Sequence, residues 1–459
     1  MNIQDLLKDK KKLPLLIAGA ALLLIILLVI ILLLTSKKED SPNNIEEEGN
    51  GNTPETRELV YWGLWESEEV MEDIIDEFET NHPGVTVKYS MQTFKDYESR
   101  LYSRLQQTAT TSEPAPDIFR IHNTWLPKFE SLLSKLPDGI MTRDEYSEKF
   151  YPTALADFTG KDGTSLYAIP LEIDGLMVFY NKQLLAQQDV EKPPTDWDSF
   201  LSLARKLTKK DSSGRITQSG LALGTSKNIQ HSSEILLFLL LQEQADLIDS
   251  TRTKFSLNNS KAISVFTTYT NFATGNNAIW SSSLKNDLNM FYSGDLAMMI
   301  APSWRAFDII QSASAIEFGT APLPQLVANP ERIYYSTYWG EAVNKKSPNT
   351  QLAWEFVEFL SEREQQLKMY SNASTIGQRA FGEPYSLKEL NSEMKGKAYV
   401  DAIATMAPYM KSVQLGEEGY VRAALEQAVT QILENNLSIE DALREAEKTI
   451  NTKLAQSNK

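Results

Sequence analysis

The chain of 459 residues contains no cysteine. Disulfide bonds, zinc–thiolate sites and cysteine nucleophiles are therefore excluded. A location outside the cytoplasm stays open, because a large core needs no disulfides. Histidine is also scarce: His82, His122 and His231 are the three present, and no two of them have the spacing of an HExxH metal helix. We expect neither a metal nor a cofactor.

Basic residues are outnumbered by acidic ones. The chain has 45 Lys and Arg against 61 Asp and Glu, a formal net charge of −16. Binding to nucleic acid needs clustered Lys and Arg, so we expect no nucleic-acid partner. The length and the hydrophobic content of 42% suit a globular chain of two domains with appendages.

One long apolar run lies near the N-terminus. Residues 13–34 carry no charge and are rich in Leu and Ile, and a helix of this length spans about 33 Å, enough to cross a bilayer. Lysines precede the run and an acidic stretch follows it. The positive-inside rule therefore places residues 1–12 in the cytoplasm and the rest of the chain outside the cell membrane. We predict a single-pass signal anchor at 13–34 and a disordered linker at 35–57; the alternative is a cleaved signal peptide.

Strand and helix patterns alternate from residue 58 onward. Residues 59–62 form a short β-type run, a helical pattern with apolar Val70, Ile74 and Phe78 follows, and residues 85–89 alternate as a second strand. Strand, helix and strand within about 30 residues form a βαβ unit, which favours a parallel sheet. Further strand-like runs lie at 117–121, 176–180, 296–300 and 333–337.

Several segments, taken in order, resemble one protein family. They include Val60-Tyr61-Trp62-Gly63, Tyr167-Ala168-Ile169-Pro170, Tyr180-Asn181-Lys182 and Ala321-Pro322-Leu323-Pro324. Together they resemble the extracellular solute-binding proteins of ABC importers, family 1, the maltose-binding-like group, over residues 58–455. The resemblance implies an α/β, periplasmic-binding-protein-like fold, in which two Rossmann-like lobes are joined by hinge crossovers and preceded by the transmembrane helix. Its expected lobes are 58–172 with 322–372 and 173–321 with 373–455.

The resemblance also implies a function. A monomer would capture a small ligand, a sugar or oligosaccharide, in the cleft between the lobes and deliver it to the permease of an ABC transporter, without catalysis. Two alternatives stay open at this point. One is a surface binding or sensory protein with the same fold but no coupling to transport. The other is a surface enzyme that acts on glycosides through two carboxylates.

Ligands of open α/β sheets bind beyond the carboxyl ends of the strands. Sugars present CH faces, which aromatic rings cover, and hydroxyl groups, which carboxylates and amides bind. We therefore expect the ligand site mainly among polar and aromatic residues that follow strand-like runs. The candidate ligand-binding residues that follow such runs are Trp65, Glu66, Asn123, Trp125, Trp304, Arg305, Trp339 and Glu341. Two further candidates are Asp174, which lies between Pro170 and the strand-like run at 176–180, and Tyr420, which lies in a Gly-rich loop before the next-to-last helix. Some of the candidates, Asp174 and Trp304 among them, match positions where the family holds its ligand.

Overall fold

The computed structural model describes residues 56–107, 115–249, 254–313, 315–327, 331–416 and 418–457. All of them belong to one compact unit. The predicted membrane segment lies outside these ranges, as does the predicted linker apart from its last two residues. No helix within the described ranges combines the length and the apolar character needed to cross a bilayer.

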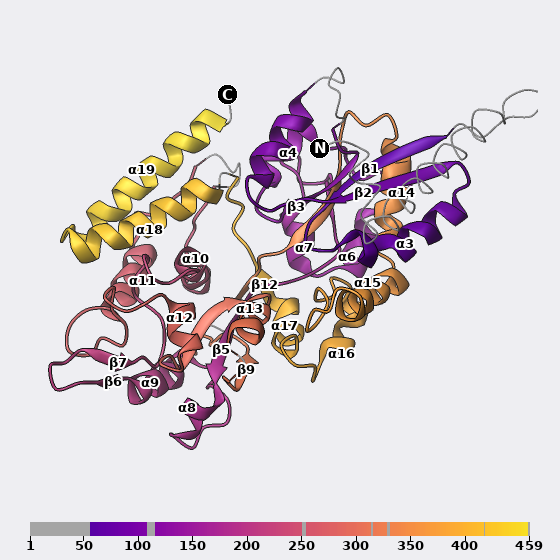
Figure 1. Cartoon of the computed structure of the whole chain (residues 1–459). Helices are drawn as coiled ribbons and strands as arrows, with labels where there is room; N and C mark the ends of the chain where they lie inside the picture. The colour runs from indigo at the N-terminus through magenta and orange to yellow at the C-terminus, as the bar shows by residue number, and fades with distance from the viewer. Residues whose placement is uncertain are drawn as a thin grey trace, which may run out of the picture. The chain divides into compact units, whose positions relative to one another are not determined.

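A mixed sheet of five strands forms one part of the fold (Figure 1). Its strand order is β2-β1-β3-β11-β4; β2 and β3 both pair with β1 in parallel, whereas β11 runs antiparallel to β3 and β4. The strands are β1 (Arg57–Gly63), β2 (Val85–Met91), β3 (Ile118–His122), β4 (Ile169–Pro170) and β11 (Trp339–Val343).

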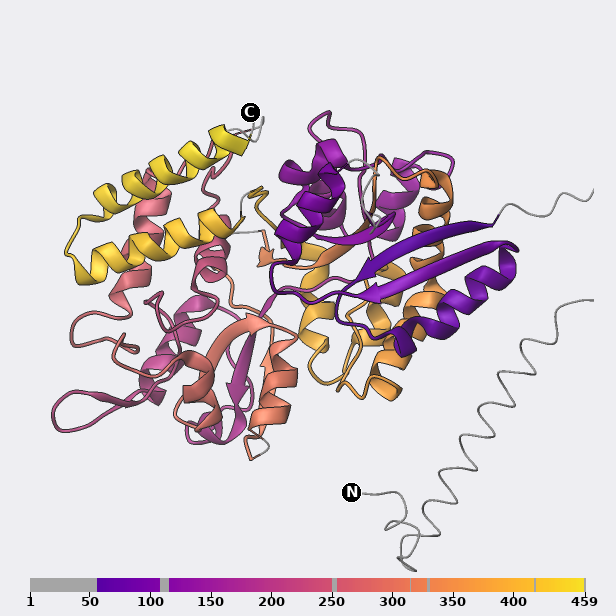
Figure 2. The same cartoon turned by 45° about the horizontal axis from the view of Figure 1, so that its top comes forward.

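The predicted βαβ unit is confirmed. Helix α3 (Glu68–Asn81) connects the parallel strands β1 and β2, which lie side by side and point the same way in Figure 2. Its buried side chains, among them Ile74 and Phe78, recur at helical spacing, and the helix packs on β2 and on helix α15 (Arg363–Thr375). The predicted run at 333–337 contains only the two-residue strand β10 (Tyr334–Tyr335), and the longer strand, β11, begins later, at Trp339.

A second sheet has three strands in the order β8-β5-β9. The predicted strand at 176–180 is its central strand, and every residue of it is buried. Both neighbours nevertheless run antiparallel to it. A continuous apolar run reports that a strand is covered on both faces, and it carries no information about the direction of its neighbours. The strands are β5 (Leu176–Asn181), β8 (Met298–Pro302) and β9 (Phe318–Ala321).

A helical layer lies beside the second sheet. Helix α10 (Ser232–Gln242) is apolar nearly all round and buried, which is typical of a helix packed on several sides. Helices α18 (Glu418–Glu434) and α19 (Ile439–Ser457) pack side by side, and both contact helix α11 (Ser260–Asn271) (Figure 1).

The other elements are mostly short helices. They are α4 (Tyr97–Gln106), α5 (Leu126–Phe129), η1 (Glu130–Leu132), α6 (Arg143–Lys149), α7 (Pro152–Asp157), α8 (Lys182–Ala186), α9 (Trp197–Leu207), β6 (Lys209–Lys210), β7 (Ile216–Gln218), α12 (Asp287–Tyr292), α13 (Arg305–Ser312), β10 (Tyr334–Tyr335), α14 (Thr350–Leu360), η2 (Lys388–Leu390), α16 (Asn391–Met394), α17 (Asp401–Met406), η3 (Ala407–Tyr409) and β12 (Met410–Lys411).

Three chain segments lie side by side between the two sheets. Gly175 bridges to Ser336, and the Thr337 N–H donates to the Asp174 carbonyl at 3.0 Å. The Ser336 N–H donates in turn to the Lys411 carbonyl at 3.0 Å, next to the parallel pair of β10 and β12. The chain therefore connects the two sheets through a hydrogen-bonded group of backbone segments.

A segment after α15 packs on the five-stranded sheet. Tyr385 bridges to Glu172, and the Ser386 hydroxyl donates to the Pro170 carbonyl at 2.7 Å. Contacts of helix α6 with η2 extend this packing as far as Leu390.

Candidate functional site

One edge of the five-stranded sheet gathers side chains from several strands. Because β1, β2 and β3 are parallel, their carboxyl ends lie at the same edge, where Trp65 follows β1 and Phe94 follows β2. β11 runs the other way, and its first residue, Trp339, is paired with His122 at the end of β3. This edge is where open α/β sheets bind their ligands.

Five rings at this edge form an aromatic cluster: Trp65, Phe94, His122, Trp125 and Trp339. The Trp339 ring centroid lies 5.0 Å from that of Trp125 and 5.2 Å from that of His122. It lies 6.1 Å from the ring of Phe94 and 6.2 Å from that of Trp65. Phe94 and Trp65 are 55% and 42% exposed, whereas Trp125 is 5% exposed. The outer rings are free to cover an apolar face of a ligand, and Trp125 supports Trp339 from within.

Trp65 and Glu66 form the turn that leaves β1. The backbone φ of Trp65 is +71°, a left-handed conformation that side chains other than glycine rarely adopt and that often marks functional sites. Glu66 is buried and forms an ion pair with Arg379. Burial and the charge of Glu383 raise the pKa of Glu66 to about 7, although Arg379 opposes this. Near neutral pH this carboxyl group can therefore both donate and accept a hydrogen bond.

Glu341 is part of a buried ionic group centred on Arg120. The Arg120 Nε lies 2.7 Å from a Glu341 carboxylate oxygen, and its two terminal nitrogens each lie 2.8 Å from an oxygen of Glu383. Glu341 is fully buried, and burial raises its pKa in spite of Arg120. The structure thus places the Glu341 carboxylate in an internal ion pair.

Two further carboxyl groups lie on the segment that connects the two sheets. One oxygen of Glu172 accepts the Trp339 N–H at 3.1 Å, which ties this residue to the aromatic cluster. Asp174 accepts hydrogen bonds from the Ser303 hydroxyl at 2.8 Å and from the Gly175 N–H at 2.7 Å. Burial raises the pKa of Asp174 to about 7, and burial together with the charge of Glu383 raises that of Glu172 well above its usual range.

Trp304 and Arg305 follow β8 of the second sheet. Trp304 is 42% exposed, with the Arg305 guanidinium 4.1 Å from its ring centroid and the His231 ring in edge contact at 5.8 Å. Arg305 also forms an ion pair with Asp308 at 2.7 Å and a hydrogen bond with Gln230. The structure brings these two candidates together, in a ring group separate from the aromatic cluster.

Asn123 and Tyr420 lie in different surroundings. The Asn123 side chain is buried, donates to Asp157 at 2.9 Å and accepts the Tyr338 N–H at 3.3 Å. Tyr420 lies in the first turn of α18 rather than in the predicted loop before it, and is 48% exposed, with the Lys453 ammonium 4.6 Å from its ring centroid.

Sequence reasoning missed Phe94, Arg379 and Glu418. Phe94 follows β2 just as Trp65 follows β1, so the rule that selected Trp65 could have found it. Glu418 accepts from the Trp125 indole N–H at 3.3 Å and lies one helical turn before Arg422. An acidic residue followed by arginine at i+4 was the available signal, but it is also common on solvated helix faces.

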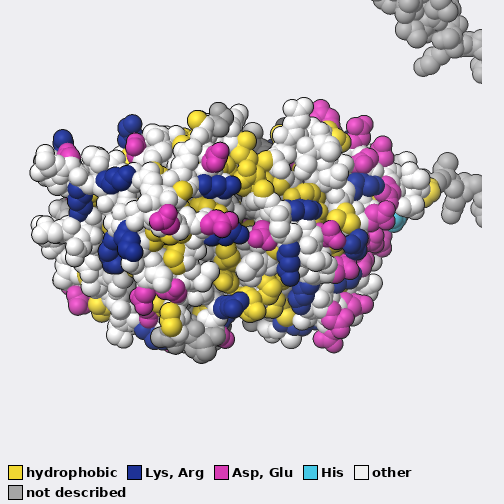
Figure 3. Space-filling view, turned by 90° about the horizontal axis from the view of Figure 1, so that it is seen from below, with side chains coloured by type: hydrophobic (Ala, Val, Ile, Leu, Met, Phe, Trp, Pro, Cys, Tyr) yellow, Lys and Arg dark blue, Asp and Glu magenta, His cyan; other side chains and the backbone are white. Residues whose placement is uncertain are grey.

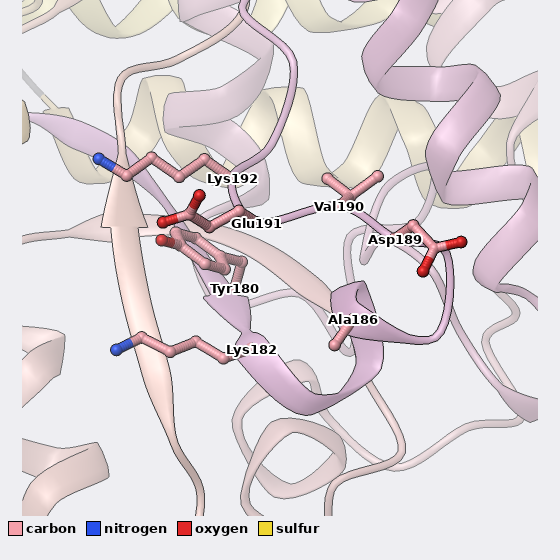
Figure 4. A pocket seen from close by; sticks show the side chains of 7 residues that line it. All are labelled: Tyr180, Lys182, Ala186, Asp189, Val190, Glu191 and Lys192. Carbon is pink, nitrogen blue, oxygen red and sulfur yellow. The ribbon is translucent and has the colours of Figure 1, made fainter.

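A hollow of about 590 Å³ lies elsewhere, at the end of β5 opposite to Asp174. Figure 4 shows the ammonium groups of Lys182 and Lys192 on the same side as the Tyr180 hydroxyl, with Asp189 directed away from them. The hollow contains no residue of the aromatic cluster. Within the described ranges, no three His, Asp or Glu side chains are grouped so that they could hold a metal ion.

Comparison with known proteins gives consistent results. Diacetylchitobiose binding protein DasA of Streptomyces coelicolor is 25% identical over 348 residues, which cover 73% of this chain and 74% of that protein. A cyclo/maltodextrin-binding protein in complex with maltotetraose superposes with a TM-score of 0.70 at 20% identity, covering 88% of this chain and 99% of the other. An ABC substrate-binding protein of Listeria monocytogenes in complex with cycloalternan gives 0.67 at 20% identity, covering 87% and 100%.

At these identities the structural likeness establishes the fold, and the predicted periplasmic-binding-protein-like α/β fold is confirmed. Residues 73–380, more than half of the chain, match the family described as bacterial extracellular solute-binding protein. The chain therefore belongs to the family of bacterial extracellular solute-binding proteins.

Proposed function

We propose that the protein binds a sugar or oligosaccharide between its two sheets and delivers it to the permease of an ABC transporter, without catalysis. The observation that carries the proposal is the graded aromatic cluster, in which exposed Trp65 and Phe94 flank the half-buried Trp339 beside Glu66 and Glu172. Rings of this kind cover the CH faces of a sugar, and buried carboxyl groups bind its hydroxyls.

The second sheet would supply the opposite wall of the site. Trp304, exposed and stacked on Arg305, follows β8, and Ser303 before it is bonded to Asp174. Figure 3 shows hydrophobic side chains gathered along the middle of one face, where charged side chains also lie among them. Two relatives bind maltotetraose and cycloalternan, and a third is named for diacetylchitobiose, which supports a carbohydrate ligand.

We further propose that each sheet is the centre of one lobe and that the group of segments at Asp174, Ser336 and Lys411 is the hinge. Ligand would stabilise the closed arrangement of the lobes through contacts made only in that arrangement. The expected lobes were 58–172 with 322–372 and 173–321 with 373–455. The contacts of Tyr385 and Ser386 with the first sheet support extending the first lobe to Leu390.

Residues 13–34 would tether the binding domain to the outer face of the cell membrane. The uncharged run of Leu and Ile and the lysines that precede it support this arrangement. The tether would keep a monomeric binding protein close to its permease.

A thermal-shift screen tests the proposed ligand class. The full-length chain, in a detergent without a sugar headgroup, is heated with maltotetraose, diacetylchitobiose, cycloalternan, amino acids or polyol phosphates. A ligand that binds the folded state raises the melting temperature. We expect at least one sugar to do so. A rise with amino acids or polyol phosphates and with none of the sugars would refute the carbohydrate assignment.

A further inference from the structure

Glu418, the first residue of α18, contacts the loop that follows β3. One oxygen of its carboxylate accepts from the Thr124 hydroxyl at 3.0 Å and from the Trp125 indole N–H at 3.3 Å. The same oxygen lies 3.2 Å from His122 Nδ1. Three residues at the edge of the five-stranded sheet are thus joined to a single carboxylate on a helix.

The helix that carries Glu418 is fixed on its other side. Arg422 lies 3.5 Å from the second oxygen of Glu418 and 3.0 Å from a carboxylate oxygen of Glu234 on α10. It also donates to the Ser233 hydroxyl at 3.2 Å. Burial opposes the ionisation of Glu418, but the charges and hydrogen bonds of His122, Arg422 and Thr124 lower its pKa to about 2. Glu418 is therefore an anion at neutral pH, held between two groups of donors.

Trp125 connects this carboxylate to the exposed rings. Its ring stacks on that of Phe129 at 5.7 Å and meets the Trp339 ring edge to face at 5.0 Å. The indole N–H of the buried Trp125 requires a hydrogen-bond acceptor, and Glu418 supplies it. The position of the Trp125 ring in turn limits where the Trp339 ring can lie.

We propose that Glu418 is a positioning residue for ligand binding. It fixes the indole of Trp125 beneath Trp339 and ties the loop after β3 to α18. The expected effect of Glu418 on ligand affinity rests on the proposed function. Its role in fixing the loop after β3 does not depend on that function. Glu418 itself need not touch the ligand.

Hydrogen exchange followed by mass spectrometry tests the hold on the loop without any ligand. In the full-length chain, Glu418→Ala increases exchange in peptides that span residues 120–130 and leaves those of β1 and β2 unchanged. Glu418→Gln, which keeps one acceptor oxygen, gives a smaller increase. Gln427→Ala, at an exposed position of the same helix, is the matched control and changes neither. Unchanged exchange at 120–130 in both Glu418 variants overturns the proposal.

A double-mutant cycle with maltotetraose, diacetylchitobiose and cycloalternan as probes tests the route through Trp125. Trp125→Phe keeps a ring but removes the N–H. We expect Glu418→Ala to weaken binding about tenfold in the wild-type background, the scale of a hydrogen bond to a charged group, and less than about twofold in the Trp125→Phe background. Equal losses in both backgrounds overturn the proposal. If the wild-type protein binds none of these sugars, the proposed function fails, and the exchange result alone decides the role of Glu418.

Discussion

The Asp174 carboxylate accepts a hydrogen bond from the Ser303 hydroxyl at 2.8 Å, across the boundary between the two sheets. Asp174 lies on the segment that leaves the first sheet, and Ser303 directly follows β8 of the second. Asp174 is 4% exposed, and burial raises the pKa of its carboxyl group to about 7. Its proton affinity is thus linked to the arrangement that brings the two sheets together.

This pKa predicts a pH dependence of stability. The folded-state pKa of Asp174 lies above that of the unfolded chain, so the folded state holds the proton to higher pH, and this group lowers stability as pH rises from about 4 to about 7. Asp174→Asn removes the effect. In urea unfolding, the free energy of unfolding of the variant should gain on that of the wild type by up to about 1.4 kcal/mol per pH unit in this window.

Asp211 provides a control in which the effect of pH on stability has the opposite sign. Hydrogen bonds from Ser213 and Arg215 hold the pKa of this partly exposed carboxyl group well below its usual range. Asp211→Asn should therefore lose stability relative to the wild type as pH rises through the unfolded pKa. A difference between Asp174→Asn and the wild type that is constant from pH 4 to pH 7 would contradict the assignment at Asp174.

The close packing around Gly175 predicts that a side chain at this position would destabilise the proposed hinge. A Cβ atom at this position would lie 2.2 Å from the backbone oxygen of Tyr335. Gly175→Ala must displace backbone in the group of segments between the sheets, and we expect a loss of about 1–3 kcal/mol in the free energy of unfolding. Gly139→Ala is the matched control, because a Cβ atom added there would have no atom within 4 Å beyond its own chain neighbours. Equal thermal stabilities of the two alanine variants would argue against close packing at Gly175.

The buried ionic group around Arg120 predicts that truncation of the Arg120 side chain alone strongly lowers the free energy of unfolding. Arg120→Ala leaves Glu341 and Glu383 without their cation in the interior, and we expect a loss of about 3–5 kcal/mol at neutral pH. Lys88 forms a comparable pair with Glu58 at 2.6 Å, but both side chains are largely exposed. Lys88→Ala should cost less than about 1 kcal/mol in the same urea titration. A loss at Arg120 no larger than that at Lys88 would contradict this account.

Local sequence patterns could predict some of the residues at the edge of the five-stranded sheet, but they could not predict the direction of every strand that brings residues there. Trp65 follows a readable β-type run, so its place at the edge could be inferred from the sequence. Trp339 was inferred from the run before it, whereas the structure makes it the first residue of β11. It reaches the edge because β11 is antiparallel to β3, and strand direction leaves no trace in a single run of residues.

Partners distant in the sequence could not be predicted. Glu418 meets Trp125 across 293 positions, and Arg379 meets Glu66 across 313. Neither contact has a local pattern, because each depends on how the whole chain folds back. The same limit applies to Glu341 and Asn123. Their sequence positions suggest a ligand site, but Arg120 and Asp157, which engage their polar groups, come from other parts of the chain. A ligand contact for these two residues stays a prediction.

Isothermal titration calorimetry of tryptophan variants on both sheets tests most directly whether a sugar is captured between the sheets. The sugar that raises the melting temperature most is titrated into wild-type protein, Trp339→Ala, Trp304→Ala and the control Tyr409→Ala, which removes a half-exposed ring outside the proposed site. We predict that each tryptophan variant weakens binding more than tenfold, about 1.4 kcal/mol or more, and that the control leaves it unchanged. Full affinity in either tryptophan variant would contradict a site formed by both sheets.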